Sequence, residues 1–172
     1  MKKILATFLL IFSLPVYSEI DVNAIYQPIL NNDKTTVNKL LSQGINPNSN
    51  FPSGWSLLYG ATINGNTEIA EALIKHGAKG GNNELEAAIT NQHTDIVSLI
   101  LKSGVNPNYF TKEGATPLML AAYWGNSEII KLLVKYNAKI DTKNTKGKTA
   151  LNIAEERKQQ YNNVIRMLTK KP

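Results

Sequence analysis

The residue types that most often carry out catalysis are scarce in this chain. It contains no cysteine and two histidines, His76 and His93. Neither histidine has a partner at the spacing of a metal motif such as His-Glu-x-x-His. His76 directly precedes Gly77 and is suited to the end of a helix, whereas His93 precedes Thr94 and is typical of a turn. We therefore expect no metal site and no nucleophile with a paired base.

The glycine-rich and acidic clusters do not fit a catalytic site either. The glycines within residues 77–81 follow a predicted helix and lack the Lys-Ser/Thr of a phosphate-binding P-loop. Glu84 and Glu86 are two residues apart, and side chains at that spacing on a helix do not face each other. Residues 155–157, Glu-Glu-Arg, are typical of a solvated surface. The sequence predicts a non-enzymatic protein without a cofactor.

One segment recurs along the chain, so the fold should be built from repeats. Residues 114–125 read Gly-Ala-Thr-Pro-Leu-Met-Leu-Ala-Ala-Tyr-Trp-Gly, and weaker copies lie at 54–61 and 147–154. Leu118 and Leu151 occupy the same place in two copies and are 33 residues apart. A period of this length is typical of stacked helical repeats.

A second set of markers indicates two helices in each repeat. Gly44, Gly77, Gly104 and Asn137 each follow an apolar run with helical spacing. Glycine and asparagine tolerate the left-handed conformation that commonly ends a helix. We therefore expect a helix to end at each of these four positions.

The clearest repeat carries a complete set of helix signals. Thr116 is predicted to cap the first helix, and Pro117 occupies the first helical position, where a missing N–H costs nothing. Gly125 is predicted to end this helix, and Ser127 to cap the second. These local signals agree with the repeat period.

At these residues the chain resembles the ankyrin-repeat family. The family signature Thr-Pro-Leu-His-x-Ala is matched at Thr116, Pro117, Leu118 and Ala121, with Met119 where histidine is usual. The resemblance implies an all-α solenoid of about five helix-turn-helix repeats with short β-turn fingers. The approximate repeats are 22–48, 49–80, 81–108, 109–141 and 142–170, and their equivalent leucine positions are Ile25, Leu58, Leu85, Leu118 and Leu151.

The terminal repeats are expected to be degenerate, since one side of each must face water. In the last repeat, two extra residues are predicted between the two helices, which puts the leucine of the second helix at Leu168.

One connection between repeats is unusually short. Gly77 to Leu85 is 8 residues, whereas Gly44 to Leu58 and the two later steps are each 14. In ankyrin repeats the missing six residues would form part of a projecting finger. Two interpretations are open: a drifted loop of no consequence, or a notch in the row of fingers that shapes the binding groove.

The N-terminus has the pattern of a secretory signal peptide. Lys2 and Lys3 precede an apolar run at residues 4–16, and small residues precede a predicted cleavage after Ser18. A membrane anchor is the alternative, but the run is short for a bilayer span and contains Pro15. We expect residues 19–172 to be a soluble ankyrin-repeat domain in the periplasm of a bacterium, or secreted from it.

Charge is distributed unevenly. Residues 19–130 hold six lysines and ten acids, giving −4, and residues 131–172 hold eleven lysines and arginines and three acids, giving +8. The basic end is interpreted as a solubilising cap, with contact to an acidic protein or an anionic lipid surface as the alternative. It lacks interleaved aromatics, so no nucleic-acid partner is expected.

The resemblance implies that a protein partner binds the finger tips and the exposed side of each first helix. We expect the chain to act as a monomer that inhibits or scaffolds a partner such as a toxin or envelope enzyme. A secreted effector that binds host proteins is the alternative. The predicted binding residues, which include both tryptophans, are Trp55, Tyr59, Ile63, Asn64, Thr90, Asn91, Lys112, Glu113, Met119, Tyr123, Trp124, Lys148, Asn152, Glu156 and Arg157. The alternative for Trp55 and Trp124 is that they pack between fingers and neighbouring helices.

Overall fold

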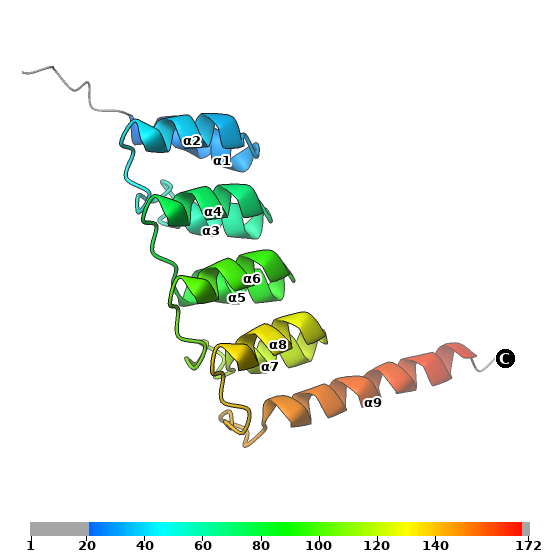
Figure 1. The fold of residues 1–172 in the computed structure, drawn as a ribbon. Coiled ribbons are helices and arrows are strands. Elements are labelled where there is room, and N and C mark those ends of the chain that lie inside the picture. Colours follow the sequence, from blue (N-terminus) through cyan, green and yellow to red (C-terminus); the bar gives the residue numbers. More distant parts are fainter. Residues whose placement is uncertain (1–20, 170–172) are drawn as a thin grey trace, which may run out of the picture.

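The computed structural model describes residues 21–169 and their side chains up to residue 159. The predicted signal peptide, residues 1–18, lies outside this range. Within it, helix pairs follow one another along a stack and one long helix comes last (Figure 1). The elements are a 3-10 helix η1 (Val22–Ile25), α1 (Tyr26–Leu30), α2 (Lys34–Ser42), α3 (Leu57–Ile63), α4 (Thr67–Lys75), α5 (Asn82–Thr90), α6 (Thr94–Lys102), α7 (Pro117–Trp124), α8 (Ser127–Lys135) and α9 (Ala150–Thr169).

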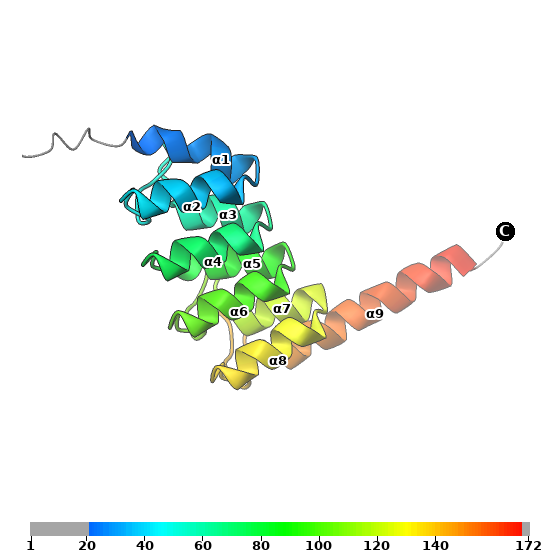
Figure 2. The same cartoon turned by 45° about the horizontal axis from the view of Figure 1, so that its top comes forward.

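The helices form two layers. The inner layer contains α1, α3, α5, α7 and α9, each in contact with the next, and the outer layer contains α2, α4, α6 and α8 (Figure 2). The core runs between the layers, and its largest fully buried side chains include Leu58, Ile69, Leu85, Ile100 and Ile129. The predicted all-α repeat architecture is confirmed.

The predicted helix ends are confirmed where the backbone requires a special residue. Gly44, Gly77, Gly104 and Asn137 have φ values of 103°, 97°, 97° and 66°. An ordinary L-residue rarely adopts this left-handed conformation, so glycine and asparagine at these positions set the ends of α2, α4, α6 and α8.

The capping pattern of α7 and α8 is confirmed except at one residue. Thr116 Oγ1 accepts a hydrogen bond from Met119 N at 3.3 Å, and Gly125 ends α7 with φ 70°. The prediction that Ser127 caps α8 is wrong. Asn126 Oδ1 accepts from the backbone N–H groups of Glu128 and Ile129, so Ser127 is the first helical residue. Asparagine is as good a cap as serine, and it lies one residue earlier.

Three β-turn fingers project between repeats in the described part of the chain. Each is closed by a backbone hydrogen bond: Phe51 N to Trp55 O at 2.8 Å, Thr111 N to Ala115 O at 2.8 Å, and Asn144 N to Lys148 O at 2.9 Å. The link from α4 to α5, residues 76–81, has no finger. A Cβ at Gly80 would lie 3.2 Å from Val105 Cγ2, so this short link packs closely against the next repeat.

The fifth repeat differs from the prediction, because it contains one helix and not two. α9 runs without a break from Ala150 to Thr169, so the predicted turn and second helix around Leu168 are absent from the described residues. No glycine or proline interrupts this segment, and most of its residues favour a helix. Figures 1 and 2 show α9 extending beyond the stack.

The continuous helix changes the environment of one predicted marker. Ile25, Leu58, Leu85 and Leu118 are buried, as expected of equivalent positions, but Leu151 is 65% exposed. Leu151 lines an apolar hollow of about 250 Å³ at the end of the stack, together with Val134 and Ile140. Leu151 therefore differs in burial from the equivalent positions of the other four repeats.

Candidate protein-binding face

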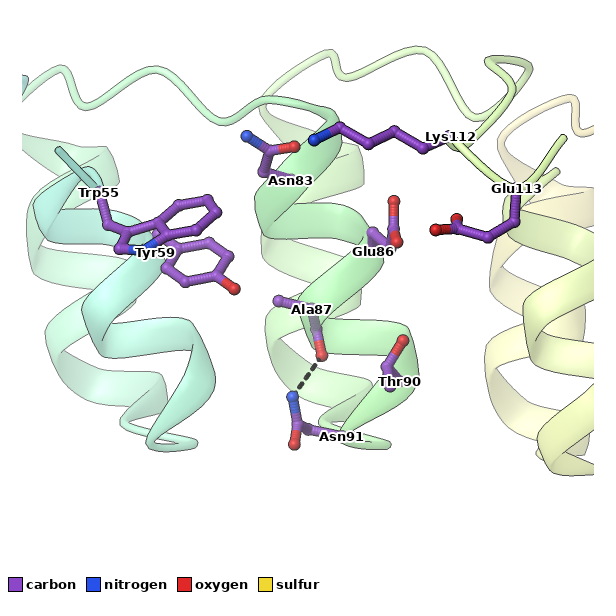
Figure 3. A pocket seen from close by; sticks show the side chains of 9 residues that line it. All are labelled: Trp55, Tyr59, Asn83, Glu86, Ala87, Thr90, Asn91, Lys112 and Glu113. Carbon is purple, nitrogen blue, oxygen red and sulfur yellow. Dashed lines mark hydrogen bonds between the residues drawn. The ribbon is translucent and has the colours of Figure 1, made fainter. Parts of the chain in front are cut away.

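A hollow of about 310 Å³ lies on the inner layer, at the place where a finger is missing. Trp55 reaches it from the finger before the short link, and Lys112 and Glu113 reach it from the finger after that link (Figure 3). Helix α5 forms its floor. We call it the first hollow, and its lining is Trp55, Tyr59, Asn83, Glu86, Ala87, Thr90, Asn91, Lys112 and Glu113. This geometry agrees with the interpretation of the short link as a notch.

One wall of the first hollow is an aromatic pair. The rings of Trp55 and Tyr59 stack with centroids 4.2 Å apart and planes inclined by 15°. Ser56 fixes the start of α3 between them, because its Oγ accepts a hydrogen bond from Tyr59 N at 2.8 Å. Trp55 remains 46% exposed. It therefore packs on one side and offers its other surface to solvent.

Two carboxylates line the first hollow, one on the floor and one on the finger opposite the aromatic pair. Figure 3 shows the Glu113 side chain directed from its finger toward Glu86 on α5. Partial burial raises the pKa of Glu86, the negative charge of Glu113 raises it further, and Lys112 opposes them. In the described part of the chain the ion pairs are Lys34–Glu68 and Lys148–Glu156, so neither Glu86 nor Glu113 belongs to one.

Helix α5 is held in place by side chains from both neighbouring repeats. The buried Glu84 accepts hydrogen bonds from Gly81 N at 3.0 Å and from Ser56 Oγ at 2.6 Å. Tyr109 donates its hydroxyl proton to Asn82 O at 2.8 Å. Burial raises the pKa of the Tyr109 hydroxyl, and the charges of Glu86 and Glu84 add to the effect. The floor of the first hollow is therefore hydrogen-bonded to the repeats on both sides.

A second hollow of about 250 Å³ lies further along the inner layer, between α7, α9 and the last finger. Arg157 Cζ lies 4.2 Å from the centroid of the Tyr123 ring, and Arg157 Nε donates to Tyr123 O at 3.2 Å. Lys148 and Glu156 form an ion pair at 2.7 Å. The lining of this second hollow is Ala115, Met119, Leu120, Tyr123, Asn144, Lys146, Lys148, Ile153, Glu156 and Arg157.

Most predicted binding residues gather at these two hollows. The first contains Trp55, Tyr59, Thr90, Asn91, Lys112 and Glu113, and the second contains Met119, Tyr123, Lys148, Glu156 and Arg157. Ile63 and Asn64 are exposed at the end of α3, outside both linings. Asn152 is also outside them, and its Oδ1 accepts hydrogen bonds from Thr149 N and Oγ1 at the start of α9.

Met119 and Trp124, both predicted binding residues, lie in surroundings that differ from the expected exposed position in the binding face. Met119 is 1% exposed, because its side chain turns back toward the start of α7 and its Sδ lies 3.3 Å from Thr116 N. Met119 belongs to the lining of the second hollow but exposes almost none of its surface. The expectation that it is open to a partner is wrong. Trp124 is 42% exposed, and its ring meets the Tyr123 ring edge-on at 5.3 Å, outside both linings.

Several lining residues were not predicted. Asn83 lies three and four residues before Glu86 and Ala87, which lie four and three residues before the predicted Thr90, so all four share one face of α5. That spacing could have identified them once the short link was recognised. Asn144 and Lys146 belong to the last finger, and only the structure places them beside α7.

Clusters of three or more potential metal ligands were not found within the described residues. None of the helices in this part of the chain is long and apolar enough to span a bilayer.

Comparison with known proteins agrees with the architecture. A family model described as "Ankyrin repeats (3 copies)" matches residues 24–111 and 88–172. Protein phosphatase 1 regulatory subunit 12A of Mus musculus is 34% identical over 83 residues, covering 48% of this chain and 8% of the relative. A putative ankyrin repeat protein of Rickettsia felis is 32% identical over 110 residues, covering 64% of this chain and 40% of the relative.

A third relative, a putative ankyrin repeat protein of fowlpox virus, is 37% identical over 99 residues, covering 54% of this chain and 23% of the relative. The chain thus spans less than half the length of each of these proteins, which come from a mammal, a bacterium and a virus. The two matches of the family model together cover the repeat stack, and the chain belongs to the ankyrin-repeat family.

Proposed function

We propose that this chain binds a partner protein in the bacterial envelope through its inner face, and that it inhibits or scaffolds that partner without catalysis of its own. Ankyrin repeats are protein-interaction modules, and the family assignment supports this general role. Envelope location is proposed from the N-terminal sequence pattern alone.

The observation that carries the proposal is the pair of hollows on one face of the stack. Together they draw on α3, α5, α7, α9 and all three described fingers, so a single partner would contact several repeats at once. Exposed Trp55 and Tyr123 lie in the two linings. Large aromatic side chains with restricted rotamers supply most of the energy in many protein interfaces.

Affinity capture from envelope extracts tests this function. The purified protein should retain a partner, and Trp55→Ala and Tyr123→Ala should each release most of it. Val134→Ala is the matched control, because Val134 is a 46% exposed hydrophobic residue of the outer helix α8. Capture that is equally sensitive to Val134→Ala, or insensitive to all three changes, would contradict binding through the inner face.

The alternative is a secreted effector that binds host proteins. It would use the same inner face. Capture from host-cell extracts in parallel with envelope extracts separates them. A partner retained from the host extract alone would support the effector role.

A further inference from the structure

The chemistry of the first hollow points to one kind of group on the partner, an inference that rests on the proposed function. We propose that the first hollow receives an arginine side chain from an exposed loop or tail of the partner protein. The guanidinium group would lie against the Trp55–Tyr59 wall and face the carboxylates of Glu86 and Glu113.

The aromatic wall is the first requirement for such a guest. Trp55 and Tyr59 are stacked at 4.2 Å with planes inclined by 15°, so each ring covers one face of the other and an outer ring face remains for a guest. Trp55 keeps 46% of its surface exposed within the lining of the hollow. A planar guanidinium group stacks on such a surface through cation–π attraction and dispersion, which a compact ammonium group does less well.

The carboxylates are the second requirement. Glu113 reaches the hollow from the finger opposite the aromatic wall and Glu86 from the floor, and Glu113 acts on Glu86 as a like charge. Neither belongs to an ion pair of the described chain, although Lys112 lies in the same lining. A cation between them would relieve their repulsion, and a guanidinium group can donate to two carboxylates at once.

The short link between α4 and α5 explains why the partner's side chain can enter. Neighbouring repeats project fingers that carry Trp55 on one side and Lys112 and Glu113 on the other, but residues 76–81 project none. Helix α5 therefore forms the open floor of the first hollow between two flanking fingers (Figure 3). The volume of the hollow is about 310 Å³. Glu84 and Tyr109 hold that floor in place through bonds to Ser56 and Asn82.

The second hollow offers an internal comparison. There the Tyr123 ring is already covered by Arg157 of this chain, with Cζ 4.2 Å from the ring centroid. The lining of the second hollow thus holds a guanidinium group over an aromatic ring, beside a carboxylate that is paired with Lys148. The first hollow has the aromatic and acidic groups but no arginine in its lining.

Binding of short blocked peptides tests the proposal without knowledge of the partner. The probes are Gly-Arg-Gly, Gly-Lys-Gly and Gly-citrulline-Gly, each acetylated and amidated. Citrulline has almost the shape of arginine but carries no charge. The signal is the indole N–H resonance of Trp55 in the purified protein, identified by its persistence in Trp124→Phe.

We expect saturable binding of the arginine peptide with Kd on the order of millimolar, weaker binding of the lysine peptide, and no saturable binding of the citrulline peptide. Glu86→Gln and Glu113→Gln should each weaken arginine binding about 2- to 5-fold, and Lys112→Gln should strengthen it by a similar factor. Glu71→Gln is the control, since Glu71 is an exposed acid on the outer helix α4. Each variant should melt in a single cooperative transition, as the parent protein does.

Equal binding of the citrulline peptide, tighter binding of the lysine peptide, or no saturable shift with arginine would overturn the proposal. Affinity capture distinguishes failure of the arginine proposal from failure of the proposed protein-binding function. Capture that is lost in Trp55→Ala but unchanged in Glu86→Gln/Glu113→Gln would leave the protein-binding role standing and remove the arginine. Binding of the arginine peptide without any captured protein would support the arginine site and contradict the protein-binding role.

Discussion

Ser56 Oγ donates a hydrogen bond to Glu84 Oε1 at 2.6 Å and so joins two neighbouring repeats. The same hydroxyl caps α3 by accepting from Tyr59 N, and the same carboxylate accepts from Gly81 N at the start of α5. One serine and one glutamate therefore fix the starts of two inner helices relative to each other. The short link between α4 and α5 needs this contact, because it has no finger of its own to pack on the preceding repeat.

Removal of the Ser56 hydroxyl should reveal this double role. Ser56→Ala removes a helix cap and leaves the buried Glu84 with one fewer donor, so we expect the free energy of unfolding to fall by about 1–3 kcal/mol. Ser42→Ala is the control, since the Ser42 hydroxyl bonds only to Lys39 O within its own helix, and it should change stability by less than about 0.5 kcal/mol. Urea denaturation measures both. Equal effects would mean that the Ser56–Glu84 bond does not stabilise the stack.

Core truncation should destabilise the whole stack. Ile100→Ala and Leu133→Ala remove side chains that are 0% exposed, so each should lower stability by about 2–5 kcal/mol. Lys131→Ala changes an exposed residue of α8 and should stay within about 0.5 kcal/mol. Circular dichroism during denaturation provides the measurement. Similar effects for Lys131 and Leu133 would be inconsistent with the assigned faces of α8.

The aromatic pair at the second hollow should affect binding more than folding. Tyr123 is 44% exposed and lines the hollow, so Tyr123→Ala should weaken partner binding by about 2 kcal/mol or more. Trp124→Ala should have a smaller effect, because Trp124 contacts the edge of Tyr123 and lies outside the lining. Calorimetry against the captured partner, with thermal melts alongside, compares the two. A large loss of stability without a specific loss of binding would place the interface elsewhere.

Stability should depend on pH through Glu86. Its pKa is raised in the folded protein by partial burial and by Glu113, with Lys112 acting in the opposite direction. The folded chain then binds more protons than the unfolded chain in the window above the ordinary glutamate pKa, so the contribution of Glu86 to stability falls as pH rises through that window.

Glu86→Gln should remove this dependence, and chemical denaturation between about pH 4 and pH 7 tests it. The pH dependence of stability through Asp33 has the opposite sign to that through Glu86. The Thr36 hydrogen bonds lower its pKa, so its contribution is present above the ordinary aspartate pKa and is lost as pH falls through the lowered value. A parent and Glu86→Gln protein with parallel pH profiles would contradict the effect of burial on Glu86.

Export is a separate prediction from the N-terminal sequence. We expect cleavage after Ser18 and recovery of residues 19–172 from the periplasm or the medium. Cell fractionation followed by N-terminal sequencing decides the matter. An uncleaved chain in the inner membrane would favour the anchor interpretation.

The most accurate predictions from the sequence concern positions at which a single residue determines the local backbone conformation. Gly44 and Asn137 adopt left-handed φ values, and Thr116 caps α7, because these effects act over a few residues. The Trp55–Glu113 juxtaposition could not be predicted, since it depends on two fingers and the length of the link between them. Met119 shares a face of α7 with the exposed Tyr123, four residues later, but its side chain turns back toward Thr116, and the residue pattern does not specify that turn. The unbroken α9 shows that a repeat period predicts where a turn would fall but not whether the local residues form it.

The missing second helix of the fifth repeat gives the stack an unequal distribution of local stability. Helices α3, α5 and α7 each pack on an inner helix before and after them and on an outer partner, whereas α9 packs on α7 as its principal neighbour. In a repeat array, stability accumulates from such neighbouring interfaces, so the α9 end should open first and most often. Backbone amides of α9 should therefore exchange with solvent hydrogen faster than those of α5. A partner that contacts Lys148 and Arg157 would bind to a segment in local folding equilibrium, and its binding would slow that exchange.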